Sequence, residues 1–142
     1  MTVVDSVGTQ IGGVVGLTFD GSQRVLANVV LQQDGRMIAL IVYPDHFEGT
    51  GPSLSYESTD CTGTPLFDGD FNTMILPGTI EGPGSTVYVP DTSTPPQALT
   101  AKSLLQLGMC FPVPGGFGLP SAIPAVPLVD LDTLYTPPFS LQ

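Results

Sequence analysis

The sequence has no tryptophan and only three cationic side chains against thirteen acidic ones, so its formal net charge is −10. Charged residues make up 11% of the chain, less than half of the usual share of about 25%. Because proteins bind nucleic acids through Lys and Arg side chains that contact phosphates, this balance excludes a nucleic-acid-binding protein. The absence of tryptophan also counts against a glycosidase, since such sites usually carry aromatic platforms for the sugar.

Long apolar runs are also missing. The longest, residues 37–43, is far shorter than the ~20 residues that a helix needs to cross a bilayer, so we expect a buried strand there and no membrane insertion. Residues 1–5 lack the cationic and apolar regions of a signal peptide. We therefore expect a mature or cloned fragment, or a protein that leaves its host without that export route, as virion proteins do at lysis.

The apolar content is nevertheless sufficient for a folded core. Hydrophobic residues make up 42% of the 142 residues, which excludes disorder caused by low hydrophobicity and fits one domain over residues 1–142. The 17 glycines and 15 prolines disfavour helices and predict many turns. The composition therefore favours an all-β protein.

Runs of β-branched residues between turn-forming residues predict the strands. In the N-terminal part, 1–43, hairpins are expected from runs at residues 3–4, 11–17, 24–31 and 36–43. The step Gln33-Asp34-Gly35 predicts the tightest of these hairpins, because Asp and Gly tolerate the positive φ of a two-residue turn. Later strand candidates are residues 53–57, 74–75, 85–89, 98–107, 126–131 and 139–141.

Two later segments are harder to assign. Residues 98–107 have propensities that permit a helix, but they lie among strands, and we predict a strand. Residues 112–127 contain five prolines, so we expect a loop or extended segment outside the sheet ladders, and we expect the C-terminal part, 112–142, to pack on neighbouring subunits. The predicted fold is an all-β antiparallel sandwich or jelly-roll-like barrel with about eight to ten short strands and long Pro/Gly-rich loops.

Residues for catalysis are sparse. His46 is the only histidine, and no Gly-x-Ser-x-Gly elbow or Cys-His framework accompanies it. We interpret it as a loop residue without a catalytic role and predict a protein that is not an enzyme and needs no cofactor.

A cation site has one weak candidate. Asp68, Asp70 and Asn72 stand at alternating positions, like the first ligands of a calcium loop, but Thr73 and Thr79 replace the glycine and glutamate that the loop needs. An acidic turn is the simpler interpretation. Other carboxylates would form an irregular site if the fold brought them together, namely Asp45, Glu48, Glu57, Asp60 and Asp91.

The two cysteines, Cys61 and Cys110, have no partner at metal-ligand spacing. They form either a disulfide that closes a loop of about fifty residues or two buried thiols. A disulfide would imply an oxidising compartment.

One segment carries a family resemblance. The stretch Tyr56 to Pro65 contains the pattern Asp-Cys-x-Gly-x-Pro, and it is followed by Thr86 to Pro90, Cys110 and a closing Pro-Pro-Phe-Ser-Leu. This order resembles a β-rich module of bacterial secreted proteins, often placed after collagen-like repeats, and of tail-fibre-like phage proteins. The resemblance implies that Cys61 and Cys110 are paired. It also implies a terminal cap or attachment domain on a trimeric stalk, with no assigned reaction.

These observations predict a structural or surface module of a homo-oligomer, expected to be a trimer, on a virion surface or in the extracellular space. The sequence lacks a collagen-like stalk, which favours a phage capsid decoration, head fibre or tail fibre. Its partners would be other copies, capsid or tail proteins, or a cell-surface receptor. The alternatives are a bacterial extracellular adhesion or filament domain, and a carbohydrate-binding module or small hydrolase with an acidic cleft.

Overall fold

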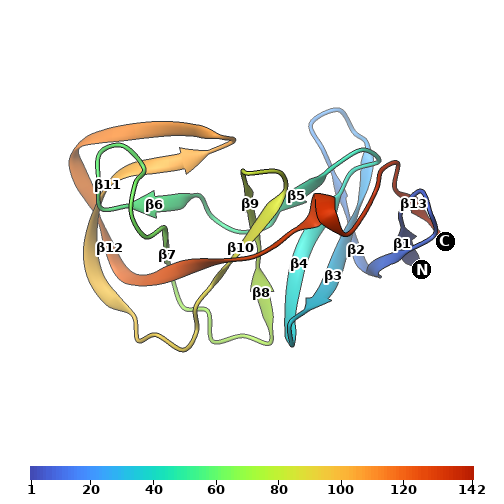
Figure 1. Ribbon diagram of the computed structural model, residues 1–142, viewed down its shortest axis with the longest axis horizontal. Coiled ribbons are helices and arrows are strands. Elements are labelled where there is room, and N and C mark those ends of the chain that lie inside the picture. The colour runs from blue at the N-terminus through green and yellow to red at the C-terminus, as the bar shows by residue number, and fades with distance from the viewer.

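The chain folds into two β-sheets that pack together as a sandwich, and the computed structural model describes all residues from Met1 to Gln142 (Figure 1). The N-terminal sheet has seven strands: β1 (Thr2–Val4), β2 (Gln10–Phe19), β3 (Val25–Gln33), β4 (Arg36–Val42), β5 (Phe47–Gly49), β8 (Ile75–Pro77) and β13 (Ser140–Leu141). The second sheet, which we call the disulfide sheet because the Cys61–Cys110 disulfide lies at it, has six strands: β6 (Leu54–Tyr56), β7 (Leu66–Asp68), β9 (Thr79–Glu81), β10 (Thr86–Pro90), β11 (Gln97–Gln106) and β12 (Met109–Asp130). The predicted all-β sandwich is confirmed.

The N-terminal sheet is built on the expected meander, in the order β13-β1-β2-β3-β4-β5. Asp34 and Gly35 both have positive φ, 50° and 74°, and they join β3 to β4 so that Gln33 pairs with Arg36. The predicted hairpin is therefore correct. One pairing differs from the expectation of a purely antiparallel fold, because β8 joins the free edge of β4 in parallel.

The main core lies between the inner face of the N-terminal sheet and β10. Alternate residues of β3 and β4 are buried, as a strand with one solvated face requires. Val87 and Val89 of β10 and Leu131 of the 3-10 turn η1 (Leu131–Thr133) close this core from the other sheet. Gly78 lies against it so closely that a Cβ would stand 2.8 Å from a methyl carbon of Ile38.

The disulfide sheet contains a small closed unit. Strands β11, β6, β7 and β12 pair in this order, and β11 also pairs with β12, so the ring of four strands closes on itself at the left of Figure 1. Its buried side chains form two further clusters, centred on Phe67 and on Leu66. Segment 98–107 is a strand, as predicted: Leu99, Ala101 and Ser103 face inward and alternate with exposed residues.

The prediction for residues 112–127 is wrong, because this segment belongs to β12 and pairs with β11, β7 and β10. Four of its five prolines lie at or beside breaks in the register, where a missing N–H costs no ladder hydrogen bond. The first break accommodates Gly115 and Gly116, both with positive φ. Bulges therefore let a proline-rich segment become the longest strand.

The structure has thirteen strands rather than eight to ten. The additional strands β5, β7 and β9 have three residues each and lie in turn-rich sequence. Such short strands carry no periodic pattern, and neighbouring strands alone define them. None of the helices in the structure has the length and hydropathy needed to span a membrane.

Candidate functional site

The predicted pair of cysteines forms a disulfide, with 6.0 Å between the Cα atoms of Cys61 and Cys110. Cys61 lies in the loop between β6 and β7, and Cys110 lies near the start of β12. The bond therefore ties this loop to the β11–β12 hairpin. Both thiols are consumed, so neither cysteine is a free nucleophile.

A buried hydroxyl supports the disulfide from the strand side. Ser103 of β11 is fully buried, accepts a hydrogen bond from the Cys61 N–H at 3.0 Å and donates one to the Ser58 carbonyl at 2.6 Å. The Ser58 hydroxyl in turn bonds Thr62. Ser103 thus holds the loop between β6 and β7 at two points, Ser58 and Cys61.

Replacing Ser103 by alanine should lower the free energy of unfolding by about 1–3 kcal/mol, because two backbone groups lose their partner in a part-buried position. Urea unfolding followed by circular dichroism measures this loss. Ser6→Ala is the matched control, since Ser6 is exposed and its change should stay within about 0.5 kcal/mol. Equal midpoints for the two variants would contradict the assigned role of Ser103.

The calcium-like triplet is arranged as a turn. Asp68 Oδ1 accepts a hydrogen bond from the Ser121 N–H at 2.8 Å, which joins β7 to β12, and Asp70 Oδ1 accepts one from the Asn72 N–H at 3.0 Å. Asp68 thus links two strands, and Asp70 holds the turn that follows it. Of the other proposed carboxylates, Asp45 and Glu48 lie on either side of His46. Nowhere do three His, Cys, Asp or Glu side chains form a group that could hold a metal ion.

Asp60 and Asp91, two more of the proposed carboxylates, lie on separate loops and accept hydrogen bonds from neighbouring residues. The Thr62 hydroxyl, followed by that of Ser58, lowers the pKa of Asp60. The Ser93 and Thr94 hydroxyls, together with the Ser93 N–H, lower the pKa of Asp91. Asp60 thus acts within its own turn, where the Thr62 hydroxyl donates to its Oδ1 at 2.6 Å.

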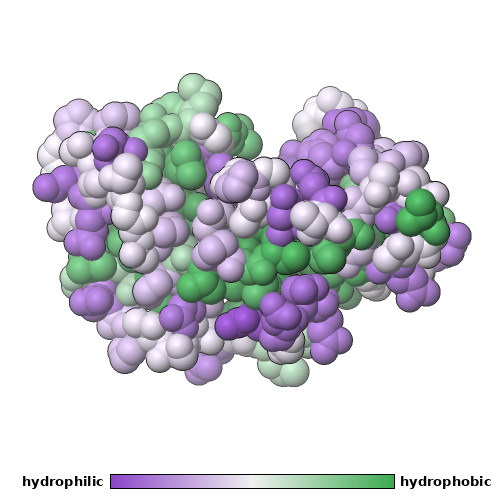
Figure 2. All heavy atoms as spheres, in the orientation of Figure 1, coloured by the Kyte–Doolittle hydropathy of each residue, from purple (hydrophilic) through white to green (hydrophobic).

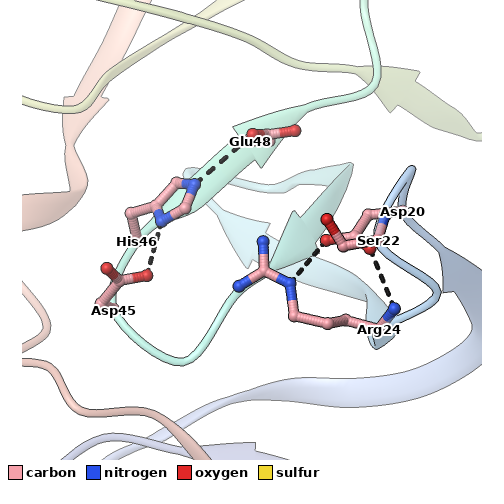
Figure 3. A network of polar contacts seen from close by, with 6 residues as sticks. All are labelled: Asp20, Ser22, Arg24, Asp45, His46 and Glu48. Atoms are coloured by element: carbon pink, nitrogen blue, oxygen red, sulfur yellow. Dashed lines mark hydrogen bonds and ion pairs between the residues drawn. The ribbon is translucent and has the colours of Figure 1, made fainter.

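The single histidine lies in an exposed network on the N-terminal sheet (Figure 3). Its Nδ1 is 2.7 Å from Asp45 Oδ1, its Nε2 is 3.4 Å from Glu48 Oε1, and its ring stacks on Tyr43 with 4.3 Å between centroids. The hydrogen bond with His46 lowers the pKa of Asp45. The side chains of Asp45, His46 and Glu48 are about half or more exposed, so these ion pairs contribute little to stability.

Arg24 extends the same network across the sheet. Its guanidinium forms an ion pair with Asp20 at 2.7 Å (Figure 3). The same group lies 5.4 Å from the centre of the Tyr43 ring. The Arg24 N–H, and then its side chain, lowers the pKa of Asp20. The cation therefore neutralises the turn that joins β2 to β3.

A groove of about 660 Å³ opens beside His46, between β5, β9 and the end of the β11–β12 hairpin. Figure 2 shows the upper outline of the molecule notched between its two lobes. Three of its twelve lining residues are hydrophobic, and the polar side chains among the others include Glu48, Glu81, Ser53 and Gln106. Glu81, which the sequence did not single out, is buried and accepts a hydrogen bond from the Gly108 N–H at 2.9 Å.

That hydrogen bond holds the end of the β11–β12 hairpin. Leu107 has a φ of 50° and is 95% exposed, and Met109 and Phe111 are exposed beside it. Figure 2 shows hydrophobic atoms gathered over this hairpin at the upper left. The hairpin end thus presents a small apolar surface that the disulfide and Glu81 hold in place.

A larger apolar surface lies on the β2–β3 hairpin. Val15, Leu17 and Phe19 of β2 and Val25 of β3 are 67%, 58%, 64% and 55% exposed, and we call these four residues the apolar hairpin surface. Val25 also lines an adjoining pocket of about 240 Å³, eight of whose ten lining residues are hydrophobic. The alternation of the β2 residues was readable in the sequence, but their exposure was not, because the same pattern is typical of a core strand.

Asp5 joins the two ends of the chain. It is almost fully buried, its Oδ1 accepts the N–H groups of Val7 and Thr9, and its Oδ2 accepts that of Thr136 at 3.1 Å. Burial alone would raise the pKa of Asp5, but the hydrogen bonds from Thr136, Thr9 and Val7 outweigh it and lower the pKa.

Asp5→Asn should therefore lower the urea midpoint at pH 7, because an amide cannot accept the Thr136 hydrogen bond as well as the other two. The folded pKa lies below the unfolded value of 3.8, so the stabilisation by the carboxylate is present above pH 3.8 and is lost as the pH falls through the folded pKa. Urea midpoints of wild type and variant should thus converge in acid. A difference that does not depend on pH would contradict this role of the charge.

Comparisons with protein-family models, with curated proteins and with solved structures find no match to this chain.

Proposed function

We propose that the chain is a non-enzymatic structural module of a homo-oligomeric assembly, displayed on a virion as a capsid decoration, head fibre or tail fibre. The observation that carries this proposal is the apolar hairpin surface, where Val15, Leu17, Phe19 and Val25 are all more than half exposed. A continuous apolar surface of this kind is typical of a protein interface. The exposed end of the β11–β12 hairpin offers a second contact.

The arrangement of reactive groups supports a non-enzymatic role. The His46 ring makes its polar contacts with two carboxylates, and both cysteines are paired in the disulfide. Nucleophilic catalysis needs a Ser or Cys within hydrogen-bond reach of a base. The described contacts of His46 do not provide that pair.

The disulfide fits an oxidising compartment, and display on a virion or a cell surface meets that condition. The net charge of −10 helps to keep such particles dispersed. A bacterial adhesion or filament domain would share both properties and differ in its genetic setting. Neighbouring genes for capsid or tail proteins would favour the virion, and genes for an export system would favour the cell surface.

Size-exclusion chromatography with light scattering tests the homo-oligomer. We expect a molar mass that is a multiple of the 14.8 kDa of one chain, and the resemblance to stalk-capping modules leads us to expect three chains. A monomer at all concentrations up to about 1 mM would refute the proposal, since that concentration corresponds to very weak association.

The polar groove supports a second candidate, a carbohydrate-binding module. Its lining combines carboxylate, amide and hydroxyl groups, which suit the hydroxyls of a sugar. Phe47 is buried, so the exposed ring in the lining is the imidazole of His46, which already stacks on Tyr43. Binding to a glycan array that Glu81→Gln abolishes would favour this candidate over a purely structural role.

A further inference from the structure

The second half of β2 has one unpaired edge. Strand β1 pairs with β2 only as far as Gly13, and the Val14 N–H donates to the Met1 carbonyl. Beyond that point, residues 16–19 pair with β3 on one side, and Val15 lies at a shift in that register. On the other side, no strand pairs with residues 15–19. An unpaired edge offers a row of backbone donors and acceptors, which is a template for another extended strand.

Two of the features that normally protect an edge strand are absent from this edge, and a third, a β-bulge, is confined to its start, where the register with β3 shifts between Val14 and Gly16. Strand β2, QIGGVVGLTF, contains no charge and no proline, although the molecule as a whole has a net charge of −10. The nearest acid, Asp20, is paired with Arg24 at the turn. Two copies can therefore approach along this edge without bringing like charges together.

We propose that two copies of the chain join through this edge, with the residues 15–19 of each copy paired antiparallel about a two-fold axis at Leu17. This contact rests on the proposed homo-oligomer and names the surface that forms it.

The register is limited on both sides. The β1 contact at Val14 closes one end of the free edge and the turn at Asp20 closes the other, so five residues are available. An antiparallel pairing that uses all five places Leu17 opposite Leu17 and Val15 opposite Phe19. This register also brings the exposed side chains of both strands to one face, because they alternate along β2.

Edge pairing continues the N-terminal sheet from one copy into the other. Leu17 of one copy would lie beside Leu17 of the other, and Val15 beside Phe19, so these exposed apolar side chains form cross-strand pairs on one face of the joined sheet. Val25 lies on β3, on the opposite side of β2, and takes no part in the contact. The contact is two-fold, so a trimer would need a further surface, for which the β11–β12 hairpin end is available.

Cysteine cross-linking tests the register. Directly opposite residues in an antiparallel pair have Cα atoms about 4.5–5.5 Å apart, within reach of a disulfide. Under mild oxidation Leu17→Cys should therefore give a covalent dimer on a non-reducing gel. Val15→Cys alone and Phe19→Cys alone should each run mainly as a single chain on that gel. A mixture of the two variants should give the covalent dimer. Equal cross-linking by all three single variants would overturn the two-fold register.

A charge at the axis gives an independent measurement. Leu17→Lys places two like charges opposite each other and should weaken the dimer by tenfold or more in Kd, as measured by sedimentation or light scattering. Met74→Lys is the matched control, because Met74 is 85% exposed and lies outside both surfaces, and it should leave the mass unchanged. Circular dichroism of each variant should match that of the wild type, which checks that the variant is folded.

The outcomes separate this contact from the proposed function. A wild-type chain that stays monomeric refutes the homo-oligomer and this contact together. A wild-type oligomer whose mass survives Leu17→Lys, and in which Leu17→Cys does not cross-link, overturns the contact and leaves the homo-oligomer standing. Loss of the oligomer with Leu17→Lys and cross-linking of Leu17→Cys support both.

Discussion

Replacing both Cys61 and Cys110 by serine should lower the free energy of unfolding by ~4 kcal/mol, the loop-closure entropy of about fifty residues in the unfolded chain. The bond connects the β6–β7 loop to the start of β12. At that point no hydrogen-bond ladder joins the loop to the strand. Urea unfolding at fixed protein concentration measures the loss. Fixed concentration matters because association would also stabilise the folded chain.

Reduction of the wild-type protein provides the control for this result. A thiol reductant should shift the wild-type urea midpoint toward that of the double serine variant and leave the variant unchanged. Non-reducing mass spectrometry should find the peptides of Cys61 and Cys110 joined. A wild-type midpoint that does not respond to the reductant would show that the bond does not stabilise the protein.

Phe67→Ala should be comparably destabilising, by about 3–5 kcal/mol, because it leaves a cavity in a closed unit that cannot easily collapse. Phe67 is fully buried among Leu54, Tyr56 and Ile123, and its ring lies 5.8 Å from that of Phe71. The loss is a large part of the 5–15 kcal/mol that stabilises a typical domain, so it is easily measured by urea unfolding.

Phe111→Ala is the matched control, since it removes the same atoms from the same sheet at a position that is 43% exposed. We expect a loss of about 1 kcal/mol or less there. Phe67→Leu should recover part of the stability because it fills most of the cavity. Similar losses for Phe67→Ala and Phe111→Ala would contradict the assignment of Phe67 to a separate core.

The proline-rich segment shows where rules based on residue type fail. A proline removes one N–H, and this excludes it from a strand only where that N–H belongs to the ladder. In β12 the register shifts near Pro112, Pro120 and Pro127 remove this conflict. Those bulges depend on the partner strands, so the sequence of the segment could not predict them.

Hydrogen bonds between residues far apart in the sequence could not be predicted either, because they also depend on the tertiary arrangement. Glu81 reaches Gly108, and Asp5 reaches Thr136, although neither acid lies in a recognisable motif. The Asp-Cys-x-Gly-x-Pro segment did indicate the cysteine pair, through the resemblance that it carries. Ser103, which holds that segment in place, has no signal of its own in the sequence.

The all-β class and the N-terminal meander with its Asp34-Gly35 turn could be predicted from the sequence alone. These properties follow from composition, from alternation with a period of two, and from backbone preferences at single residues. The parallel pairing of β8 with β4, the strand at residues 112–127 and the exposure of Leu17 and Phe19 are visible only in the folded structure. Pairing partners and coverage by another sheet are non-local, and an apolar strand has the same pattern whether its face is buried in a core or left open for a partner.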